Sequence, residues 1–149
     1  MRIAVVHGPN LRLLGRREPD IYGSETLEEI DRALLDLASE LGVEVEIFQS
    51  NHEGEILDFL EEASGRVGGV LINPAGLTHT SVSLRDALLG IGLPAVEIHL
   101  SNPATRERFR HRSFVAGAAL GTVAGFGKNS YLLGLRALIA HLTNPKTRP

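Results

Sequence analysis

The first part of the chain decides the fold, because it contains one complete strand–helix–strand unit. The run RIAVVH at residues 2–7 is short, apolar and rich in β-branched residues, which indicates a buried strand. Residues 26–41, TLEEIDRALLDLASEL, place apolar side chains at the three- and four-residue spacing of a helix, which Gly42 ends. The run VEVEIF at residues 43–48 then alternates apolar and charged residues as a strand does. This unit predicts two parallel strands joined by a crossover helix.

The rest of the chain repeats the alternation of strand and helix. Ser50 followed by Glu53 is a capping-box pattern that opens the next helix. No internal repeat and no linker interrupts the order, so we predict a single domain over residues 1–149. Five strands alternating with helices predict a three-layer α/β, flavodoxin-like fold with a five-stranded parallel sheet in the order 2-1-3-4-5. We predict further strands at 69–72, 94–98 and 115–124, helices at 55–63, 81–89 and 130–142, and a frayed tail at 143–149.

The composition excludes several classes of protein. The 149 residues are 43% hydrophobic and 22% charged, which is enough for an ordinary globular core. The absence of cysteine excludes a disulfide scaffold, a thiolate metal site and a thiol nucleophile. Aromatic residues are 5% with no tryptophan, which argues against a base-stacking surface for nucleic acid. No apolar run approaches the roughly 20 residues of a membrane span and no signal-peptide pattern is present, so we expect no membrane partner and a cytoplasmic location.

The charge is distributed unevenly along the chain. The formal net charge is -3, yet residues 63–149 carry 10 basic and 3 acidic side chains. Four of the 13 arginines lie within residues 106–112. A guanidinium binds a carboxylate or a phosphate through paired hydrogen bonds, so this cluster suits a small anionic ligand. A solvated surface or a subunit contact is the alternative interpretation.

Polar side chains follow three of the predicted strands, at the edge where ligands bind in this class of fold. Asn10 follows the first strand, Asn73 ends the third, and His99 and Ser101 follow the fourth. Glu97 lies two residues before His99, so both side chains share one face of a strand. A carboxylate beside an imidazole fixes its tautomer and favours its charged form, which suits a general acid, although a simple ion pair is the alternative. Ser101 lies at a predicted helix start, where N–H groups bind anions.

The connection at residues 11–23 is long and charged, which predicts a lid over the same edge. It contains Arg17 and Tyr22. A guanidinium beside the phenol would stabilise the phenolate, which would make Tyr22 a candidate base, although a tyrosine packed on the surface is the alternative interpretation.

His79 lies near the exit of the third strand and is a candidate ligand contact. A zinc or iron site built from His79, His99 and Glu97 lacks a ligand spacing, so we expect no metal.

Several segments resemble the signature of the type II 3-dehydroquinate dehydratases, and they occur in the same order along almost the whole chain. The segments are GPNL at 8–11, LLG at 13–15, REP at 17–19, YG at 22–23, QSNHEG at 49–54, THTS at 78–81, EIHLSN at 97–102, RE at 106–107 and FR at 109–110.

The resemblance implies a cofactor-free anti elimination of water from 3-dehydroquinate, through an enolate, to 3-dehydroshikimate. It implies that Tyr22 is the base for the C2 proton and that Arg17 tunes this phenol. Asn10 is implied to hold the water that stabilises the enolate. His99 is implied to be the acid that protonates the departing C1 hydroxyl, oriented by Glu97.

The resemblance also implies the substrate-binding residues and the assembly. Leu100 and Ser101 would bind the substrate carboxylate, and Asp86 would reach the site of a neighbouring subunit in a homo-oligomer of trimers that form a dodecamer. The full implied set of substrate-binding residues is Asn73, His79, Asp86, Leu100, Ser101 and Arg110.

The sequence departs from the family pattern at a few positions, none of which is an implied acid or base. Arg12 stands where the family usually has Asn, Ala75-Gly76-Leu77 where it has Gly-Ala-Tyr, and Arg112 and Phe114 where it has His and Tyr.

The alternative function is a flavodoxin-like module that binds a flavin or a nucleotide. Such a module would need a phosphate loop rich in Gly, Ser and Thr after the first strand, and the chain lacks one there.

Overall fold

The computed structural model describes residues 1–16 and 18–144. Five strands form one parallel sheet in the order β2-β1-β3-β4-β5, which confirms the predicted strand order. The strands are β1 (Arg2–His7), β2 (Glu44–Gln49), β3 (Gly69–Asn73), β4 (Ala95–His99) and β5 (Gly121–Ala124).

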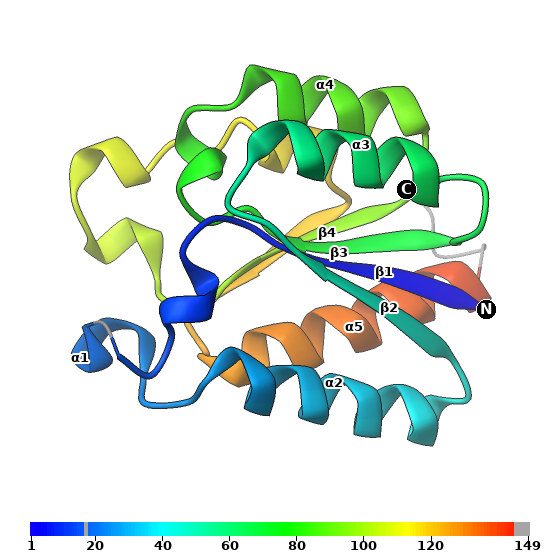
Figure 1. Cartoon of the computed structure of the whole chain (residues 1–149), viewed down its shortest axis with the longest axis horizontal. Coiled ribbons are helices and arrows are strands. Elements are labelled where there is room, and N and C mark those ends of the chain that lie inside the picture. Colours follow the sequence, from blue (N-terminus) through cyan, green and yellow to red (C-terminus); the bar gives the residue numbers. More distant parts are fainter. Residues whose placement is uncertain (17, 145–149) are drawn as a thin grey trace.

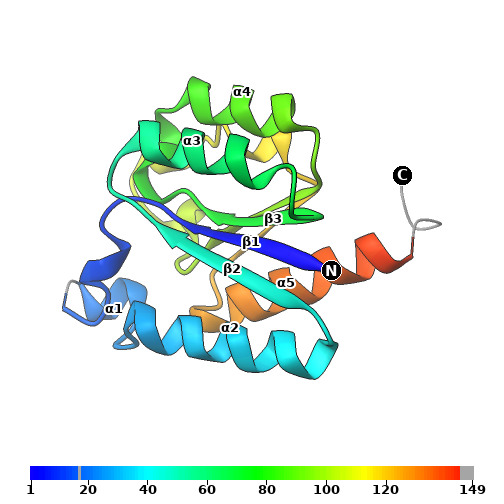
Figure 2. The same cartoon turned by 45° about the vertical axis from the view of Figure 1, so that its right-hand side comes forward.

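Helices cover both faces of the sheet, as the alternation of strand and helix predicts (Figure 1). One face carries α2 (Leu27–Leu41) and α5 (Lys128–Thr143), and the other carries α3 (Glu53–Ala63) and α4 (Val82–Ile91). Figure 2 shows the sheet between the two helix pairs from a second angle. Within the described part of the chain, no helix is long and apolar enough to cross a membrane.

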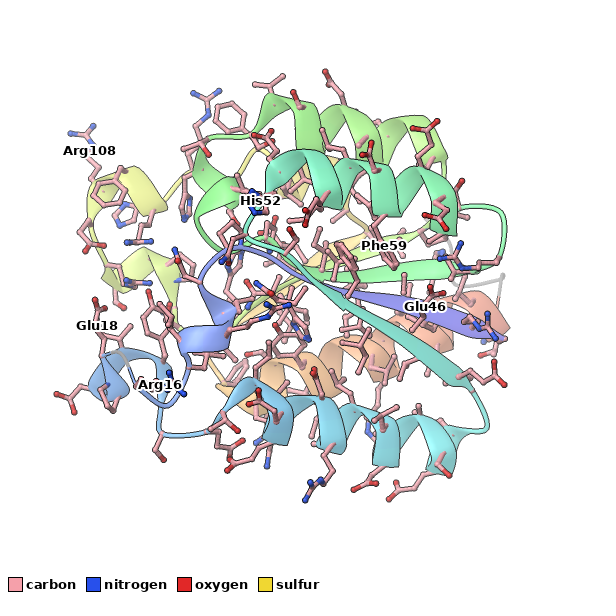
Figure 3. All side chains as sticks on the ribbon, viewed as in Figure 1. Arg16, Glu18, Glu46, His52, Phe59 and Arg108 are labelled. Carbon is pink, nitrogen blue, oxygen red and sulfur yellow. The ribbon has the colours of Figure 1, made fainter. Side chains whose placement is uncertain are left out.

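The alternation of side chains along each strand decides which helix pair a residue meets. Ile3 and Val5 of β1 pack with α2 and α5, whereas Ala4 and Val6 pack with α3 and α4. Figure 3 shows Phe59 pointing from α3 toward the sheet. The core therefore consists of two apolar layers, one on each face of the sheet.

The helix α5 lies directly on the sheet because Gly134 has no side chain. A Cβ atom at this position would lie 2.3 Å from Cδ1 of Ile98 and 3.0 Å from Cδ1 of Leu71. Real Cβ atoms essentially never come this close to another heavy atom, so an alanine here would force the Ile98 and Leu71 side chains to shift within a closely packed core.

Most predicted elements begin and end within two residues of their positions in the structure, but the predicted strand at 115–124 is wrong in its first half. Residues Ala116–Ala118 form a 3₁₀ helix, and β5 begins only at Gly121. The hydroxyl of Ser113 accepts the N–H groups of Val115 (3.2 Å) and Ala116 (3.0 Å). These two donors are therefore engaged locally and do not join a strand ladder.

The predicted capping box is also wrong, because its two residues bind other partners. The hydroxyl of Ser50 accepts the N–H of His52 (2.9 Å) and donates to the carboxylate of Glu55. The carboxylate of Glu53 instead accepts a hydrogen bond of 2.6 Å from the hydroxyl of Ser81, the N-cap of α4. Glu53 thus joins α3 to α4 rather than closing its own helix start.

Two helix ends lie further along the chain than the sequence predicts. The helix α4 continues through Gly90 and ends at Ile91, and the following Gly92 is its C-cap, with a left-handed φ of 68°. The helix α5 includes Thr143, so the predicted tail does not begin there. Residues 145–149 of that predicted tail lie outside the described residues.

Candidate active site

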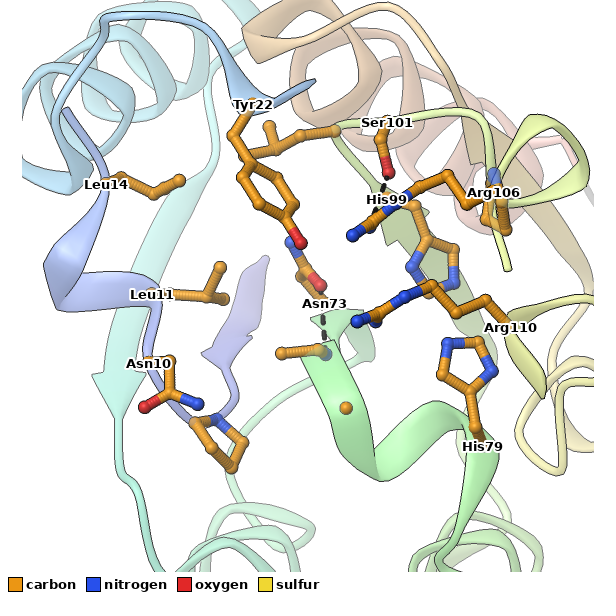
Figure 4. A pocket seen from close by; sticks show the side chains of 15 residues that line it. Asn10, Leu11, Leu14, Tyr22, Asn73, His79, His99, Ser101, Arg106 and Arg110 are labelled. Atoms are coloured by element: carbon orange, nitrogen blue, oxygen red, sulfur yellow. Dashed lines mark hydrogen bonds between the residues drawn. The ribbon is translucent and has the colours of Figure 1, made fainter. Parts of the chain in front are cut away.

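A cavity of about 160 Å³ lies beyond the carboxyl ends of β1, β3 and β4 (Figure 4). This is the edge at which parallel sheets of this class bind their ligands. Of the residues predicted for the site, the lining contains Asn10, Tyr22, Asn73, His79, His99, Leu100, Ser101 and Arg110.

The exits of β1 and β3 approach each other closely at Gly8. Its N–H donates to the carbonyl of Asn73 (2.8 Å), and a Cβ atom on Gly8 would lie 2.4 Å from the carbonyl oxygen of Pro74. Asn10 then turns the chain with a φ of 71°, and its N–H donates to Oδ1 of Asn51 (3.0 Å). The first wall of the cavity is therefore fixed by backbone contacts.

Glu97 and His99 form a buried pair on β4, as their spacing predicts. Oε2 of Glu97 lies 2.9 Å from Nε2 of His99, and Oε1 accepts a hydrogen bond of 2.7 Å from the hydroxyl of Ser113. A carboxylate only accepts, so Nε2 of His99 carries a proton and Nδ1 is left for a ligand. Ser113 could not be predicted, because it lies in a loop and only the folded chain brings it to β4. This arrangement fixes the orientation of the imidazole at the edge of the cavity.

Tyr22 belongs to α1 (Pro19–Tyr22), a helix of 4 residues. Its hydroxyl points into the cavity (Figure 4). The guanidinium of Arg106 lies 5.0 Å from the centroid of the Tyr22 ring, which is a cation–π contact. Arg17 lies outside the described residues, so its place beside Tyr22 stays a prediction.

The sequence alone does not single out Arg106 as a site residue, although this residue lies in the predicted arginine cluster. It lines the cavity, and its Nη1 donates to the hydroxyl of Ser101 (3.2 Å). Arg110 also lines the cavity and is held by Glu107, whose Oε2 accepts from Nε at 2.6 Å. Arg108 is exposed and points away from the protein (Figure 3). The cluster is thus divided, and two of its guanidinium groups face the cavity.

The electrostatics of the cavity favour an anionic ligand. Two arginines and two histidines line it, and none of the described residues that line it is acidic. The predicted helix start at Ser101 is only a 3₁₀ turn, Pro103–Thr105, capped by the Asn102 side chain at 3.2 Å from the N–H of Ala104. So short a turn has no appreciable dipole, so anion binding here depends on the Ser101 hydroxyl and the guanidinium groups rather than on a helix.

His79 is oriented by the backbone. Its Nδ1 lies 2.7 Å from the carbonyl of Arg112, so Nδ1 carries a proton and Nε2 is left for a ligand. Asp86 is exposed on α4 and does not line the cavity. Among residues 1–16 and 18–144, the structure shows no group of three His, Asp or Glu side chains that could hold a metal ion.

The comparisons with known proteins agree on one family. The family model described as "Dehydroquinase class II" matches residues 1–139. A 3-dehydroquinate dehydratase from Geotalea daltonii is 55% identical over 142 residues, which are 95% of this chain and 99% of that protein. One from Acaryochloris marina is 58% identical over 140 residues, 94% of each chain.

Solved structures give the same result. The type II dehydroquinase from Butyrivibrio crossotus superposes with a TM-score of 0.92 at 39% identity, covering 93% of this chain and 97% of that one. The type II dehydroquinase from Propionibacterium acnes gives a TM-score of 0.88 at 40% identity, covering 96% and 97%. The chain therefore belongs to the class II dehydroquinase family.

Proposed function

We propose that the protein is a lyase of the shikimate pathway that removes water from 3-dehydroquinate to give 3-dehydroshikimate. Membership of the family supports this reaction. The observation that carries the proposal is the meeting, in one small basic cavity, of the Tyr22 hydroxyl and the His99 imidazole that Glu97 orients. No cofactor is part of the proposal.

In the proposed mechanism Tyr22 is the base and His99 is the acid. The Tyr22 phenolate, favoured by Arg17, removes the proton from C2 beside the ketone, and the electrons of that bond form an enolate. A water held by Asn10 donates to the enolate oxygen, which is the developing charge that needs a fixed donor. The C1–O bond then breaks as His99 protonates the hydroxyl, so that a C1–C2 double bond and one water are the products.

The charges of the cavity support a definite orientation of the substrate. Its carboxylate would bind Leu100 and the hydroxyl of Ser101, beside the guanidinium of Arg106. The ring hydroxyls would bind Asn73, His79 and Arg110, which line the same cavity.

We further propose that residues 1–149 form one catalytic domain that acts in the cytoplasm as a homo-oligomer, a dodecamer made of four trimers. Asp86 lies exposed on α4 outside the cavity, a place from which it would reach the site of a neighbouring subunit.

The proposal is tested by ultraviolet absorbance after 3-dehydroquinate is added, because the conjugated enone of the product absorbs and the substrate does not. We expect Tyr22→Phe and His99→Ala each to lower kcat by about 10²–10⁴-fold while the melting temperature is kept. His141→Ala, a histidine near the far end of α5, is the matched control and keeps the rate. An unmodified protein that gives no absorbance change, or a folded Tyr22→Phe variant with a near-normal rate, would refute the proposal.

A further inference from the structure

Three polar side chains lie behind the cavity, and the mechanism above uses none of them. Asp31 of α2, His7 at the end of β1 and Tyr131 of α5 form a continuous chain of hydrogen bonds. Nε2 of His7 lies 2.7 Å from Oδ1 of Asp31, and Nδ1 lies 2.8 Å from the hydroxyl of Tyr131. His7 and Tyr131 are both 0% exposed. Burying a polar group costs free energy unless the group is hydrogen-bonded. The hydrogen bonds within this chain are therefore needed to keep its members in the core.

The hydrogen bonds of this chain run in a single direction. The carboxylate of Asp31 only accepts, so Nε2 of His7 carries the proton and donates it. In the neutral imidazole Nδ1 is then an acceptor, and the hydroxyl of Tyr131 donates to it. Burial raises the pKa of Tyr131, so this hydroxyl keeps its proton and remains a donor at neutral pH.

Asn73 lies next to this chain of hydrogen bonds and lines the cavity. His7 and Asn73 are partners across β1 and β3, so their side chains leave the same face of the sheet. The Asn73 side chain also acts on the Tyr131 phenol, whose pKa it lowers against the larger effect of burial. Oδ1 of Asn73 accepts the N–H of Ala75 (3.1 Å), so the NH₂ group is the end of the amide that is left for a ligand. The amide is thus held by the backbone at Oδ1 and has the buried His7 beside it.

We propose that Asp31, His7 and Tyr131 are positioning residues that hold the neighbouring Asn73 amide so that its NH₂ group points to a ring hydroxyl of the substrate. The inference rests on the proposed function only for the identity of that ligand. The three residues themselves do not line the cavity. They act through Asn73 alone, and this predicts a defect in substrate binding rather than in proton transfer.

The variant Tyr131→Phe tests the proposal, because it keeps the ring and removes the hydroxyl. We expect KM for 3-dehydroquinate to rise about tenfold, which corresponds to the loss of one oriented hydrogen bond, while kcat changes less than about twofold. Asp31→Ala should raise KM similarly. The double variant should be no worse than Tyr131→Phe alone, because both changes act through the same amide.

Two control variants match these changes. Asp36→Ala removes an exposed carboxylate from the same helix as Asp31. Thr143→Val removes a hydroxyl from the same helix as Tyr131, where it donates to the carbonyl of Ile139 at 2.9 Å. Both controls should keep KM within about twofold of the unmodified protein, a change too small for a lost ligand hydrogen bond.

The results separate this proposal from its alternatives. A folded Tyr131→Phe variant with unchanged KM, or effects of the two single variants that multiply, would overturn it. Asn73→Ala with unchanged KM would overturn it as well, since Asn73 would not touch the substrate. If Tyr131→Phe does not fold, Asp31→Ala replaces it as the deciding variant, because the Asp31 side chain is 28% exposed and its loss disturbs the core less.

A structural readout distinguishes failure here from failure of the proposed function. If the unmodified protein does not dehydrate 3-dehydroquinate, crystal structures of it and of Tyr131→Phe still test the positioning chain. An Asn73 amide that leaves the N–H of Ala75 in the variant supports the positioning chain, and an unmoved amide overturns it.

Discussion

The carboxylate of Glu97 contacts the imidazole of His99 from a position two residues earlier on the same strand, with Oε2 2.9 Å from Nε2. Both residues are buried, and the hydroxyl of Ser113 occupies the other carboxylate oxygen at 2.7 Å. The pair therefore fixes which nitrogen of His99 faces a ligand, since Nε2 donates to Glu97 and Nδ1 is left free of it.

Glu97→Gln should lower kcat by about 100-fold, because a neutral amide stabilises an imidazolium less than a carboxylate does. Ser113→Ala should lower kcat by less than about tenfold, since it removes only one hydrogen bond from Glu97. Glu61→Gln, an exposed change on α3, is the control for loss of charge. The rate of enone formation is the measurement, and a normal kcat in Glu97→Gln would contradict the role of the carboxylate.

Ala75→Gly should not destabilise the protein, and we expect it to raise the free energy of unfolding by about 0.5 kcal/mol. Ala75 has a φ of 53°, a left-handed conformation that strains any residue with a Cβ atom. Ala137→Gly, at an exposed position inside α5, should instead lower the free energy of unfolding by about 1 kcal/mol. Urea denaturation of both variants measures the difference, and a loss at position 75 equal to that at 137 would exclude backbone strain.

Gly134→Ala and Gly90→Ala should change stability in opposite directions although both lie in helices. At Gly134 the new Cβ would collide with Ile98 and Leu71, so we expect a loss of about 1–3 kcal/mol. At Gly90 nothing lies within 4 Å of the new atom, so the better helix propensity of alanine should add about 0.5–1 kcal/mol. Thermal unfolding of both variants is the test, and equal shifts of the melting temperature would contradict the close approach of α5 to the sheet.

The stability of the protein should fall in alkaline solution in part because of Tyr131. Burial raises the pKa of this phenol above the ordinary 10.0, so the folded state holds the proton more tightly than the unfolded state does. The stabilisation that comes from the protonated phenol is therefore complete below about pH 10. Above that pH the free energy of unfolding falls by up to about 1.4 kcal/mol per pH unit. Tyr131→Phe lacks this slope, so urea denaturation from pH 9 to 11 should show the two free energies of unfolding converging. If the free energies of unfolding of the two proteins run parallel from pH 9 to 11, the raised pKa of the Tyr131 phenol would be contradicted.

The strand order could be predicted from the sequence because the information is local and repeated. The first, third, fourth and fifth predicted strands are short apolar runs, and the second alternates apolar and charged residues. The helix at 26–41 shows apolar residues at helical spacing. The predicted strand at 115–124 failed in its first half because Ser113, a residue outside the run, binds the N–H groups of Val115 and Ala116. A small-residue run shows its apolar character in the sequence but not the local hydrogen bonds that remove it from a sheet.

The candidate site could be predicted in part because side chains alternate between the two faces of a strand. Glu97 and His99 share a face of one strand, and their pairing follows from a spacing of two. Arg106 and Ser113 could not be singled out, since both belong to irregular segments whose path depends on the folded core. His7 could be placed at a strand end, but its partners come from α2 and α5, and no local pattern indicates that Asp31 and Tyr131 meet there.

Tyr22 reaches the cavity on a helix of 4 residues with left-handed backbone on each side, at Glu18 (φ 39°) and Gly23 (φ 83°). A single turn of helix is not stable by itself, so the place of the phenol depends on its surroundings. One of those surroundings is the guanidinium of Arg106, which also binds Ser101 on the opposite wall. In the proposed mechanism, binding of the substrate carboxylate and the position of the Tyr22 base would therefore depend on the same side chain. A substitution at position 106 that changes ligand preference would then disturb proton abstraction as well.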